Sequence, residues 1–295
     1  MGKEYPKWLV GCGVGCLAVL VVGFIIGLGG VLTVRKVAGG FKEAQQAVSR
    51  VEGEFGPADA YTPEADGRIP ADRIEAFLAV REATATVRSR LGARVEELEA
   101  MTGERDTQQK SGLRKFLTVL RTGAGAIPRI AEFEHSRADA LMTNRMGLGE
   151  YWYIYSLAYY SSLKKDPGDG PSKLHTQDGG DNIRLDDHTD PQDIRESRRS
   201  KMSRQVNRLF RRVLQNGVQD SRPAEKSPEK SPWVQAAEKE LAALEEKPDR
   251  IPWEDGLPPQ IEESLLPFRD KLDGSYDPLM NPLEFMEFRD HRQQW

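Results

Sequence analysis

Cysteine is nearly absent from this sequence, which contains only Cys12 and Cys16. Both lie in the apolar stretch 8–34, so the rest of the chain has no disulfide, no thiolate metal site and no cysteine nucleophile. Common catalytic motifs are also missing: Gly-x-Ser-x-Gly, a phosphate-binding loop and His-Glu-x-x-His do not occur. The sequence therefore predicts no cofactor and offers no specific sign of an enzyme.

A strong excess of one charge is lacking as well. The net charge is -4 over 295 residues, so no global basic field points to a nucleic-acid partner. Hydrophobic residues make up 38%, and many of them lie in the stretch 8–34. The remainder is lean in core-forming residues, and we expect part of it to be unstructured. The length predicts one or two domains outside that stretch.

Residues 8–34 contain no charged side chain. About 20 helical residues cross a hydrocarbon core of ~30 Å, and a helix closes the backbone hydrogen bonds that lipid leaves unsatisfied. A cleaved signal peptide is the alternative, but its apolar region is usually only about 7–15 residues long. This stretch is longer, and Arg35 and Lys36 follow it. We expect an uncleaved single-pass anchor in the lipid bilayer, with the soluble part on the periplasmic or external side.

The anchor carries glycines at a spacing of four, namely Gly11, Gly15, Gly23 and Gly27. Small residues at this spacing let two membrane helices approach closely, which favours a homodimer through the anchor. The alternative is that these glycines reflect only the general frequency of glycine in membrane helices.

Apolar residues beyond the anchor recur at steps of three and four, which is the period of amphipathic helices. Helices are expected over 41–55, from about 70 to 98, from 113 to 142 and over 148–164. Thr122 to Pro128 should kink or break the third of these, because an internal proline costs a helix roughly 3 kcal/mol. Helices of this length joined by short turns predict an antiparallel bundle.

The second half of the chain alternates between linkers and helices. Residues 165–193 are rich in aspartate, and residues 194–214 place Met202, Val206, Leu209, Phe210 and Val213 on one helical face. The fold class is thus all-α, with an N-terminal single transmembrane helix followed by a helical bundle with flexible linkers. The expected segments are 1–7, a short tail; 8–34, the transmembrane helix; 35–164, a membrane-proximal bundle; 165–193, an acidic flexible linker; 194–217, a basic amphipathic helix; 218–232, a second linker; and 233–295, a C-terminal helical segment.

Two stretches, YTPEADGRIPADRIEAFLAVRE (61–82) and MGLGEYWYI (146–154), resemble segments of uncharacterised bacterial proteins that are membrane-anchored or exported. In that family a helix opens after a proline-containing turn, and a Glu-Tyr-x-x-Ile helix follows later. The resemblance covers about a tenth of the chain. It implies a bacterial source and a helical domain, and it implies no activity.

Two polar patterns suggest metal sites. Glu132-x-x-His135 has the spacing found in di-iron bundles, but such sites need this motif twice. Asp139 lies four residues after His135, so a hydrogen-bonded pair on one helical face is the simpler interpretation. The aspartates and histidines of 175–190 lack the fixed spacing of a calcium loop. Neither pattern predicts a metal.

Aromatic residues crowd the helix near 151–160. Tyrosine suits both cores and interfaces, because it combines a large apolar ring with a polar tip. Two interpretations follow: a bundle core with hydroxyls at its edge, or a surface for a partner or ligand. The second would use Tyr151, Trp152, Tyr155 and Tyr159.

The helix 194–217 carries the densest positive charge of the chain. Its candidate contacts with an anionic surface are Arg198, Arg199, Arg204, Arg208, Arg211 and Arg212. A membrane surface or an acidic protein partner would bind such a helix, and a solvated face compensated by the acidic linker is the alternative. Nucleic acid is not expected, because no aromatics interleave with the arginines.

The leading functional hypothesis is a membrane-anchored helical protein that acts by binding a protein partner, as a scaffold or accessory subunit of a bacterial envelope complex. The alternative is a membrane-tethered enzyme with a carboxylate and histidine site in the bundle. A deep pocket around Glu132, His135 and Asp139 would favour the enzyme, and a filled apolar bundle would favour the binding protein.

Overall fold

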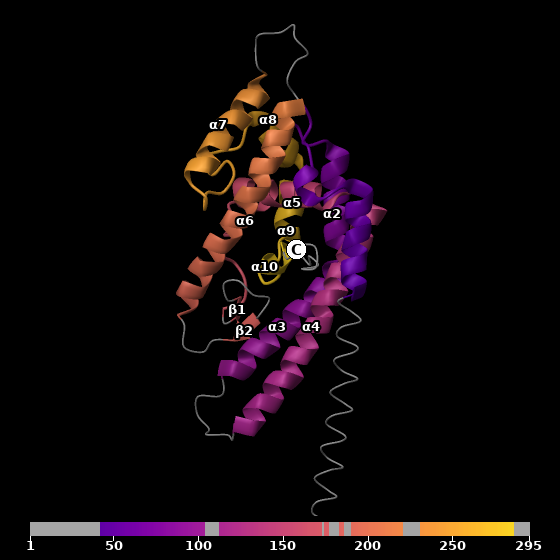
Figure 1. Ribbon diagram of the computed structural model, residues 1–295, viewed down its shortest axis with the longest axis vertical. Coiled ribbons are helices and arrows are strands. Elements are labelled where there is room, and N and C mark those ends of the chain that lie inside the picture. The colour runs from indigo at the N-terminus through magenta and orange to yellow at the C-terminus, as the bar shows by residue number, and fades with distance from the viewer. Residues whose placement is uncertain are drawn as a thin grey trace, which may run out of the picture.

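The computed structural model describes residues 42–103, 112–172, 174–176, 183–185, 190–220 and 231–285 (Figure 1). These residues form a helical bundle, which confirms the predicted helical fold. The described part also contains one short antiparallel ribbon, in which β1 (Leu174–Thr176) pairs with β2 (Ile183–Leu185).

No helix among the described residues is both long and apolar enough to cross a membrane. The expected anchor 8–34 lies outside the described part of the chain, and so do its glycines Gly11, Gly15, Gly23 and Gly27. The transmembrane segment and its dimer contact therefore stay predictions.

The first described helix covers residues 42–55 and ends at Gly56, as expected from the Gly-Pro pair there. The elements that follow are a 3₁₀ turn at Ala58–Ala60, α2 (Ala71–Ala83), α3 (Ala85–Gly103), α4 (Gly112–Thr143), α5 (Leu148–Tyr155) with a π-helical turn at Ser156–Ser162, α6 (Pro191–Asp220), α7 (Pro232–Glu246), α8 (Pro259–Leu265), a 3₁₀ turn at Leu266–Phe268, α9 (Arg269–Ser275) and α10 (Asn281–Glu284).

The helix expected from 70 to 98 is divided at Thr84, which separates α2 from α3. The Thr84 hydroxyl donates to the carbonyl oxygen of Val80 at 2.9 Å. Such local bonds between a threonine side chain and the preceding turn compete with regular helical hydrogen bonds. Periodicity alone does not detect this division, because both helices continue the same apolar stripe.

The expectation of a break at Thr122 to Pro128 is wrong, since α4 runs unbroken from Gly112 to Thr143 with Pro128 inside it, while the alternative of a kink stays a prediction. Proline removes one backbone donor and crowds the preceding turn. Here Pro128 lies at the exposed surface, while Ile130 and Phe133 just beyond it are buried with Leu91 of α3. Packing of α4 along α3 thus outweighs the local cost.

The stretch 165–193 is not a structureless linker throughout, because residues 165–172 pack against the start of α6. A side chain at Gly168 would approach the carbonyl oxygen of Arg195 to 2.7 Å, so the two backbones lie in close contact. The basic helix is also longer than expected, since α6 covers Pro191–Asp220.

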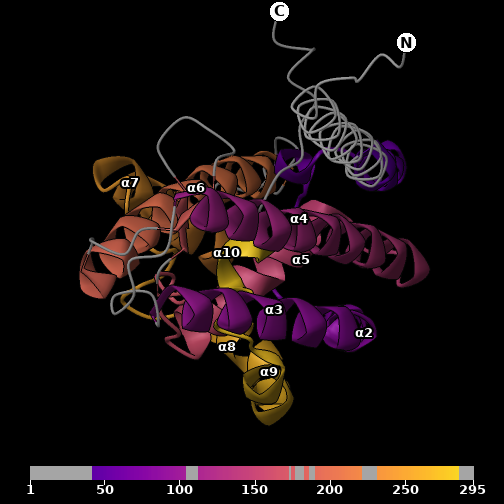
Figure 2. The ribbon, with the colours of Figure 1, turned by 90° about the horizontal axis from the view of Figure 1, so that it is seen from below.

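Two layers of paired helices surround the last described segment. α3 lies along α4, and α6 lies along α7. Figure 2 shows α10 in the middle of the bundle, between α3 on one side and α4 and α5 on the other. The last described segment is therefore a central part of the core, and its hydrogen-bond partners come from α2, α4, α5, α6 and the π-helical turn.

Candidate functional site

Three arginines are buried at the centre of the bundle: Arg81 on α2, Arg88 on α3 and Arg137 on α4. Arg137 interrupts an apolar stripe on α4, between Phe133 and Leu141. A charge removed from water is very costly unless it is paired and hydrogen-bonded. The described core must therefore supply these guanidinium groups with carboxylates and hydrogen-bond acceptors.

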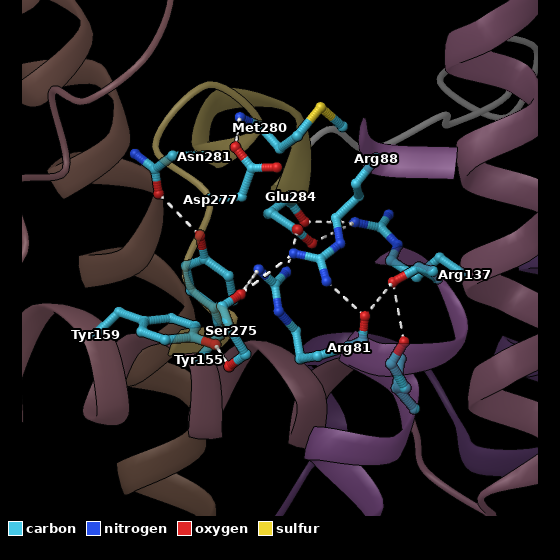
Figure 3. A network of polar contacts seen from close by, with 12 residues as sticks. Arg81, Arg88, Arg137, Tyr155, Tyr159, Ser275, Asp277, Met280, Asn281 and Glu284 are labelled. Atoms are coloured by element: carbon cyan, nitrogen blue, oxygen red, sulfur yellow. Dashed lines mark hydrogen bonds and ion pairs between the residues drawn. The ribbon is translucent and has the colours of Figure 1, made fainter. Parts of the chain in front are cut away.

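The carboxylate of Glu284 on α10 forms ion pairs with two of these arginines (Figure 3). Arg81 Nη1 donates to Glu284 Oε1, and the Tyr151 hydroxyl donates to Oε2 at 2.8 Å. Arg137 Nη1 lies 3.8 Å from the same Oε2 atom. Burial by itself would raise the pKa of Glu284, but the positive charges of Arg81, Arg137 and Arg88 outweigh it and hold that pKa below its usual value. Glu284 is thus ionised at neutral pH.

The backbone carbonyl of Ser275 accepts hydrogen bonds from two of the guanidinium groups, those of Arg81 and Arg88. Arg81 Nη2 donates to it at 2.7 Å, and Arg88 Nη1 donates to it at 3.3 Å. Ser275 is the last residue of α9, where a carbonyl lacks a partner within its own helix. Arg88 Nη2 donates in addition to the carbonyl oxygen of Arg81. The carbonyl at the end of α9 therefore accepts hydrogen bonds from these arginines where another carboxylate would otherwise be needed.

Glu134 is the second buried carboxylate, and its two oxygens differ. Oε2 accepts a hydrogen bond from Arg137 Nη2, whereas Oε1 has no partner among the described residues. Burial raises the pKa of Glu134 to about 7, against the lowering effect of Arg137. A cavity of about 10 Å³ beside it is lined by Val48 and Val51 of the first helix, among others. This volume is about that of one water molecule.

The four aromatic residues expected at a partner surface lie in the core instead. Tyr151, Trp152, Tyr155 and Tyr159 are each at most 2% exposed, so they cannot form a docking face. The alternative, a bundle core with hydroxyls at polar positions, is what the structure shows. Tyr155 donates to Asn281 Oδ1 at 3.0 Å, and burial raises the pKa of Tyr155 well above its usual value. The Tyr151 and Tyr155 hydroxyls therefore act as hydrogen-bond donors to the last described segment.

On the basic face of α6, some arginines bind neighbouring elements, and others have no carboxylate partner among the described residues. Arg195 donates to Asp166 at 3.0 Å and to Asp169 at 2.9 Å, and Arg198 donates to the carbonyl oxygen of Gly168 at 2.9 Å. These contacts fix residues 166–169, which belong to the stretch expected to be a flexible linker, against the start of α6. Arg199 lies 3.9 Å from Asp166, and Arg211 lies 3.3 Å from Glu245.

Arg204, Arg208 and Arg212 form a basic stripe, since they are exposed at successive four-residue steps along α6. No carboxylate of the described residues lies within ion-pair distance of any of the three. Arg212 also borders an open groove of about 390 Å³, but Asp59 and Asp220 line the same groove and make it unsuited to an anion. The stripe itself, rather than the groove, is the candidate contact with negative charge.

The apolar face of α6 is not available to a membrane. Met202, Val206, Leu209, Phe210 and Val213 are all buried in the main core. These residues pack α6 onto the bundle, so they are not free to enter a lipid interface.

The carboxylate and histidine pattern on α4 lies at the surface. His135 Nδ1 lies 3.2 Å from Asp139 Oδ2, so the two side chains share one helical face as expected, but Nδ1 makes no hydrogen bond to the described residues. Glu132 is held by Arg129 at 2.8 Å. No group of three or more histidine, cysteine, aspartate or glutamate side chains in the described ranges could hold a metal. The pattern is therefore a set of surface ion pairs.

The comparisons with known proteins add no family. No protein-family model matches the chain, and neither a curated protein nor a solved structure is significantly similar to it. The fold and the site define a helical protein with a closed polar core and one exposed basic stripe.

Proposed function

We propose that this chain is a bilayer-tethered helical binding protein, an accessory component rather than an enzyme, whose basic stripe rests on anionic lipid headgroups. The observation that carries the proposal is the exposure of Arg204, Arg208 and Arg212 without a carboxylate partner in the described part of the chain. Each exposed arginine close to an anionic membrane surface contributes about 1 kcal/mol to the binding free energy.

The predicted tether supports lipid as the partner. Residues 35–41 separate the expected anchor from the first described helix, and a segment of that length spans at most about 25 Å. The helical body is then always close to the bilayer, so even a weak attraction acts at high local concentration. An acidic protein would have to be recruited to the same place.

The buried apolar face decides how this contact works. Since Val206 and Phe210 belong to the core, the contact has no insertion of apolar side chains and depends on charge alone. Attraction between exposed charges is screened beyond about 10 Å at 0.1 M salt. We therefore expect docking that salt reverses.

Two observations argue against the enzyme alternative. Glu132, His135 and Asp139 are at least partly exposed, Glu132 pairs with Arg90 and Arg129, and none of the three lines either of the two cavities described above. The buried arginine cluster borders a cavity that has room for only one water molecule, so a substrate has no space beside it.

The test measures the distance between the body and the lipid in the full-length protein. A donor fluorophore is attached at Gln215→Cys on α6, with Cys12 and Cys16 replaced by serine, and acceptor-labelled lipids are placed in nanodiscs. We expect higher energy transfer in phosphatidylglycerol-containing discs than in phosphatidylcholine discs, and loss of this difference at high salt and in Arg204→Gln/Arg208→Gln/Arg212→Gln.

The matched control removes the same charge elsewhere, at the exposed Lys239, Arg269 and Lys271 of α7 and α9. This triple glutamine variant should keep the lipid dependence. Equal transfer in both kinds of disc would overturn the lipid proposal, and so would an equal loss in the two triple variants.

A further inference from the structure

The last described residues, Leu279–Phe285, lie in a groove built by α2, α4, α5, α6 and the π-helical turn. We call these residues the tail segment. They are held by side chains that lie far from them in the sequence, as a bound peptide would be. Three positions of the segment, Asn281, Glu284 and Phe285, carry most of the polar and aromatic contacts.

Asn281 uses both ends of its amide. Its Oδ1 accepts from Tyr155 at 3.0 Å and from Tyr160 at 2.6 Å, and its Nδ2 donates to the carbonyl oxygens of Pro167 at 3.0 Å and Asp169 at 3.2 Å. An amide side chain offers two donors and two acceptor sites. The groove therefore satisfies the hydrogen bonding of an asparagine, and an apolar residue in its place would leave the two tyrosine hydroxyls without their acceptor.

Phe285 and the backbone complete the recognition. The Phe285 ring stacks on Trp152 with ring centres 5.5 Å apart. Arg137 Nη1 and Trp152 Nε1 each donate to the Glu284 carbonyl oxygen at 2.6 Å, and Gln205 donates to the carbonyl oxygen of Phe285. The groove thus recognises both the side chains and the main chain of an Asn-x-x-Glu-Phe sequence.

The ion pair between Arg81 and Glu284 gives this groove its selectivity. A buried ion pair is a poor source of stability, because the desolvation of both charges offsets their attraction. Its best-attested use is to impose one register and one partner, since any misplaced segment leaves a buried charge unpaired. A segment without a glutamate at this place would leave the buried charge of Arg81 unpaired.

We propose that this groove is a peptide-binding site and that its alternative occupant is the tail segment of a second copy of the chain. The own tail and the tail of a neighbour would make the same contacts, so local concentration and the hinge decide between them. Tyr276, Asp277 and Pro278 form a short connection between the end of α9 and the tail segment. Short hinges favour exchange between copies, and the exchanged segment is the last described one.

A cross-linking experiment with two full-length copies tests the exchange. A Cβ atom at Gly92 of α3 would lie 3.8 Å from Leu279 Cδ1, so these positions report on occupancy of the groove. With Cys12 and Cys16 replaced by serine, one copy carries Gly92→Cys and the other Leu279→Cys. A short bismaleimide linker should join the two copies, with a yield that rises with protein concentration. One chain that carries both cysteines is the positive control for linking within a copy.

Two controls separate exchange from mere proximity of anchored copies. Lys239→Cys on α7 replaces Gly92→Cys in the first control and should give no link. In the second, the copy with Gly92→Cys also carries Arg81→Met/Glu284→Leu, so that its groove and tail match each other but not those of the other copy. Exchange would then leave one buried charge unpaired in each groove, and the yield should fall at least tenfold, because each such charge costs more than the about 1.4 kcal/mol that a factor of ten requires. Glu262→Gln on the exposed surface of α8 should not lower it.

The main outcome does not depend on a variant that could fail to fold, because the first cysteine pair leaves the arginine cluster intact. Links only within single chains, at every protein concentration, would overturn the proposal. Equal yields from Gly92→Cys and Lys239→Cys would overturn it as well. The basic stripe takes no part in this test, so its result is separate from that of the lipid experiment.

Discussion

Arg81 and Glu284 lie 203 positions apart in the sequence and form an ion pair in which neither side chain is more than 1% exposed. The pair joins α2, near the start of the bundle, to α10 at the end of the described chain. The pair therefore holds the last described helix against the first half of the bundle.

Removal of one partner of this pair should be far more damaging than removal of both. Glu284→Gln leaves the Arg81 charge buried without its carboxylate, and such changes cost about 3–5 kcal/mol. Arg81→Met/Glu284→Leu should recover most of that loss, because well-packed apolar residues replace buried ion pairs at little cost. Urea unfolding of the full-length protein in detergent, followed by circular dichroism, measures both. A double variant as unstable as the sum of its single variants would contradict the prediction.

The stability of the protein should depend on pH through Glu134. Its pKa is about 7 in the folded protein against 4.5 ordinarily. Between these values the folded state holds a proton that the unfolded state has lost, so the free energy of unfolding falls as the pH rises. The slope is at most about 1.4 kcal/mol per pH unit. Glu134→Gln should remove this slope, and Glu132→Gln, on the exposed side of α4, should keep it. Unfolding curves at several pH values between 4.5 and 7.5 provide the measurement.

Glu284 should act in the opposite direction at lower pH. Because its pKa is lowered in the folded state, the stability that it contributes is fully present above its ordinary pKa and is lost as the pH falls through the folded value. Acid unfolding of the wild-type protein should therefore set in below about pH 4.5. Arg81→Met/Glu284→Leu should show a smaller loss of stability over the same range, as measured by circular dichroism during acid titration.

The buried tyrosines should differ in what their hydroxyl groups contribute. The Tyr155 hydroxyl donates to Asn281, whereas the Tyr153 hydroxyl is buried without a partner among the described residues. Tyr155→Phe should cost about 1–2 kcal/mol of stability, while Tyr153→Phe should be neutral or stabilising. Thermal unfolding of the two variants side by side tests this difference. A greater loss from Tyr153→Phe would count against the contacts described for the two rings.

Two glycines provide a matched pair for close packing. A Cβ atom at Gly149 would lie 2.1 Å from the carbonyl oxygen of Ala58, which is backbone and cannot move aside, while nothing lies within 4 Å of one at Gly53. Gly149→Ala should cost about 1–3 kcal/mol or more through overpacking. Gly53→Ala, inside the first described helix, should instead stabilise by about 0.5–1 kcal/mol. Urea midpoints of the two variants measure the difference.

The expected anchor is tested by extraction. Alkaline carbonate releases peripheral proteins from membranes, so a chain held by residues 8–34 should stay in the membrane fraction. Substitution of two mid-stretch residues, Leu20→Arg and Ile25→Arg, should release the protein, since each arginine near the bilayer centre costs about 2.5–3.5 kcal/mol. Intact wild-type protein in the soluble fraction would show that the stretch is not an anchor.

Local patterns in the sequence predicted much of the bundle. The Gly56-Pro57 pair marked the end of the first described helix, and Pro70 marked the start of α2. The helix at 148–164 was also expected, and α5 with its π-helical turn confirms it, while α7 falls in the expected C-terminal helical segment 233–295. These features depend on residues within a few turns of one another, so an apolar period of three and four suffices to find them.

Where local sequence patterns gave the wrong prediction, contacts between elements distant in the sequence determined the structure. Pro128 does not break α4, because buried contacts with α3 on one side of the helix outweigh the loss of one hydrogen bond. The apolar face of α6 was recognised correctly, but sequence could not tell whether a bilayer or the protein core would cover it. The same holds for Tyr151 and Tyr155, whose rings suit either a surface or a core.

The arginine cluster was missed, although one signal was present. Arg137 lies within the apolar stripe of α4, and a charged residue in such a position indicates a buried partner. No local signal marks Glu284 or Asn281, because short polar segments near a chain end are common at protein surfaces. Only the tertiary structure brings them to the centre.

The sequence by itself determined which segments are helical, which face of each helix is apolar, and that residues 8–34 are suited to a bilayer. The tertiary structure alone decided that the last described segment enters the core, that Arg81 meets Glu284, and that three arginines of α6 are left facing outward. The physical reason is range: helix formation and amphipathicity follow from neighbours along the chain, whereas the pairing of buried charges depends on which surfaces the assembled helices bring together.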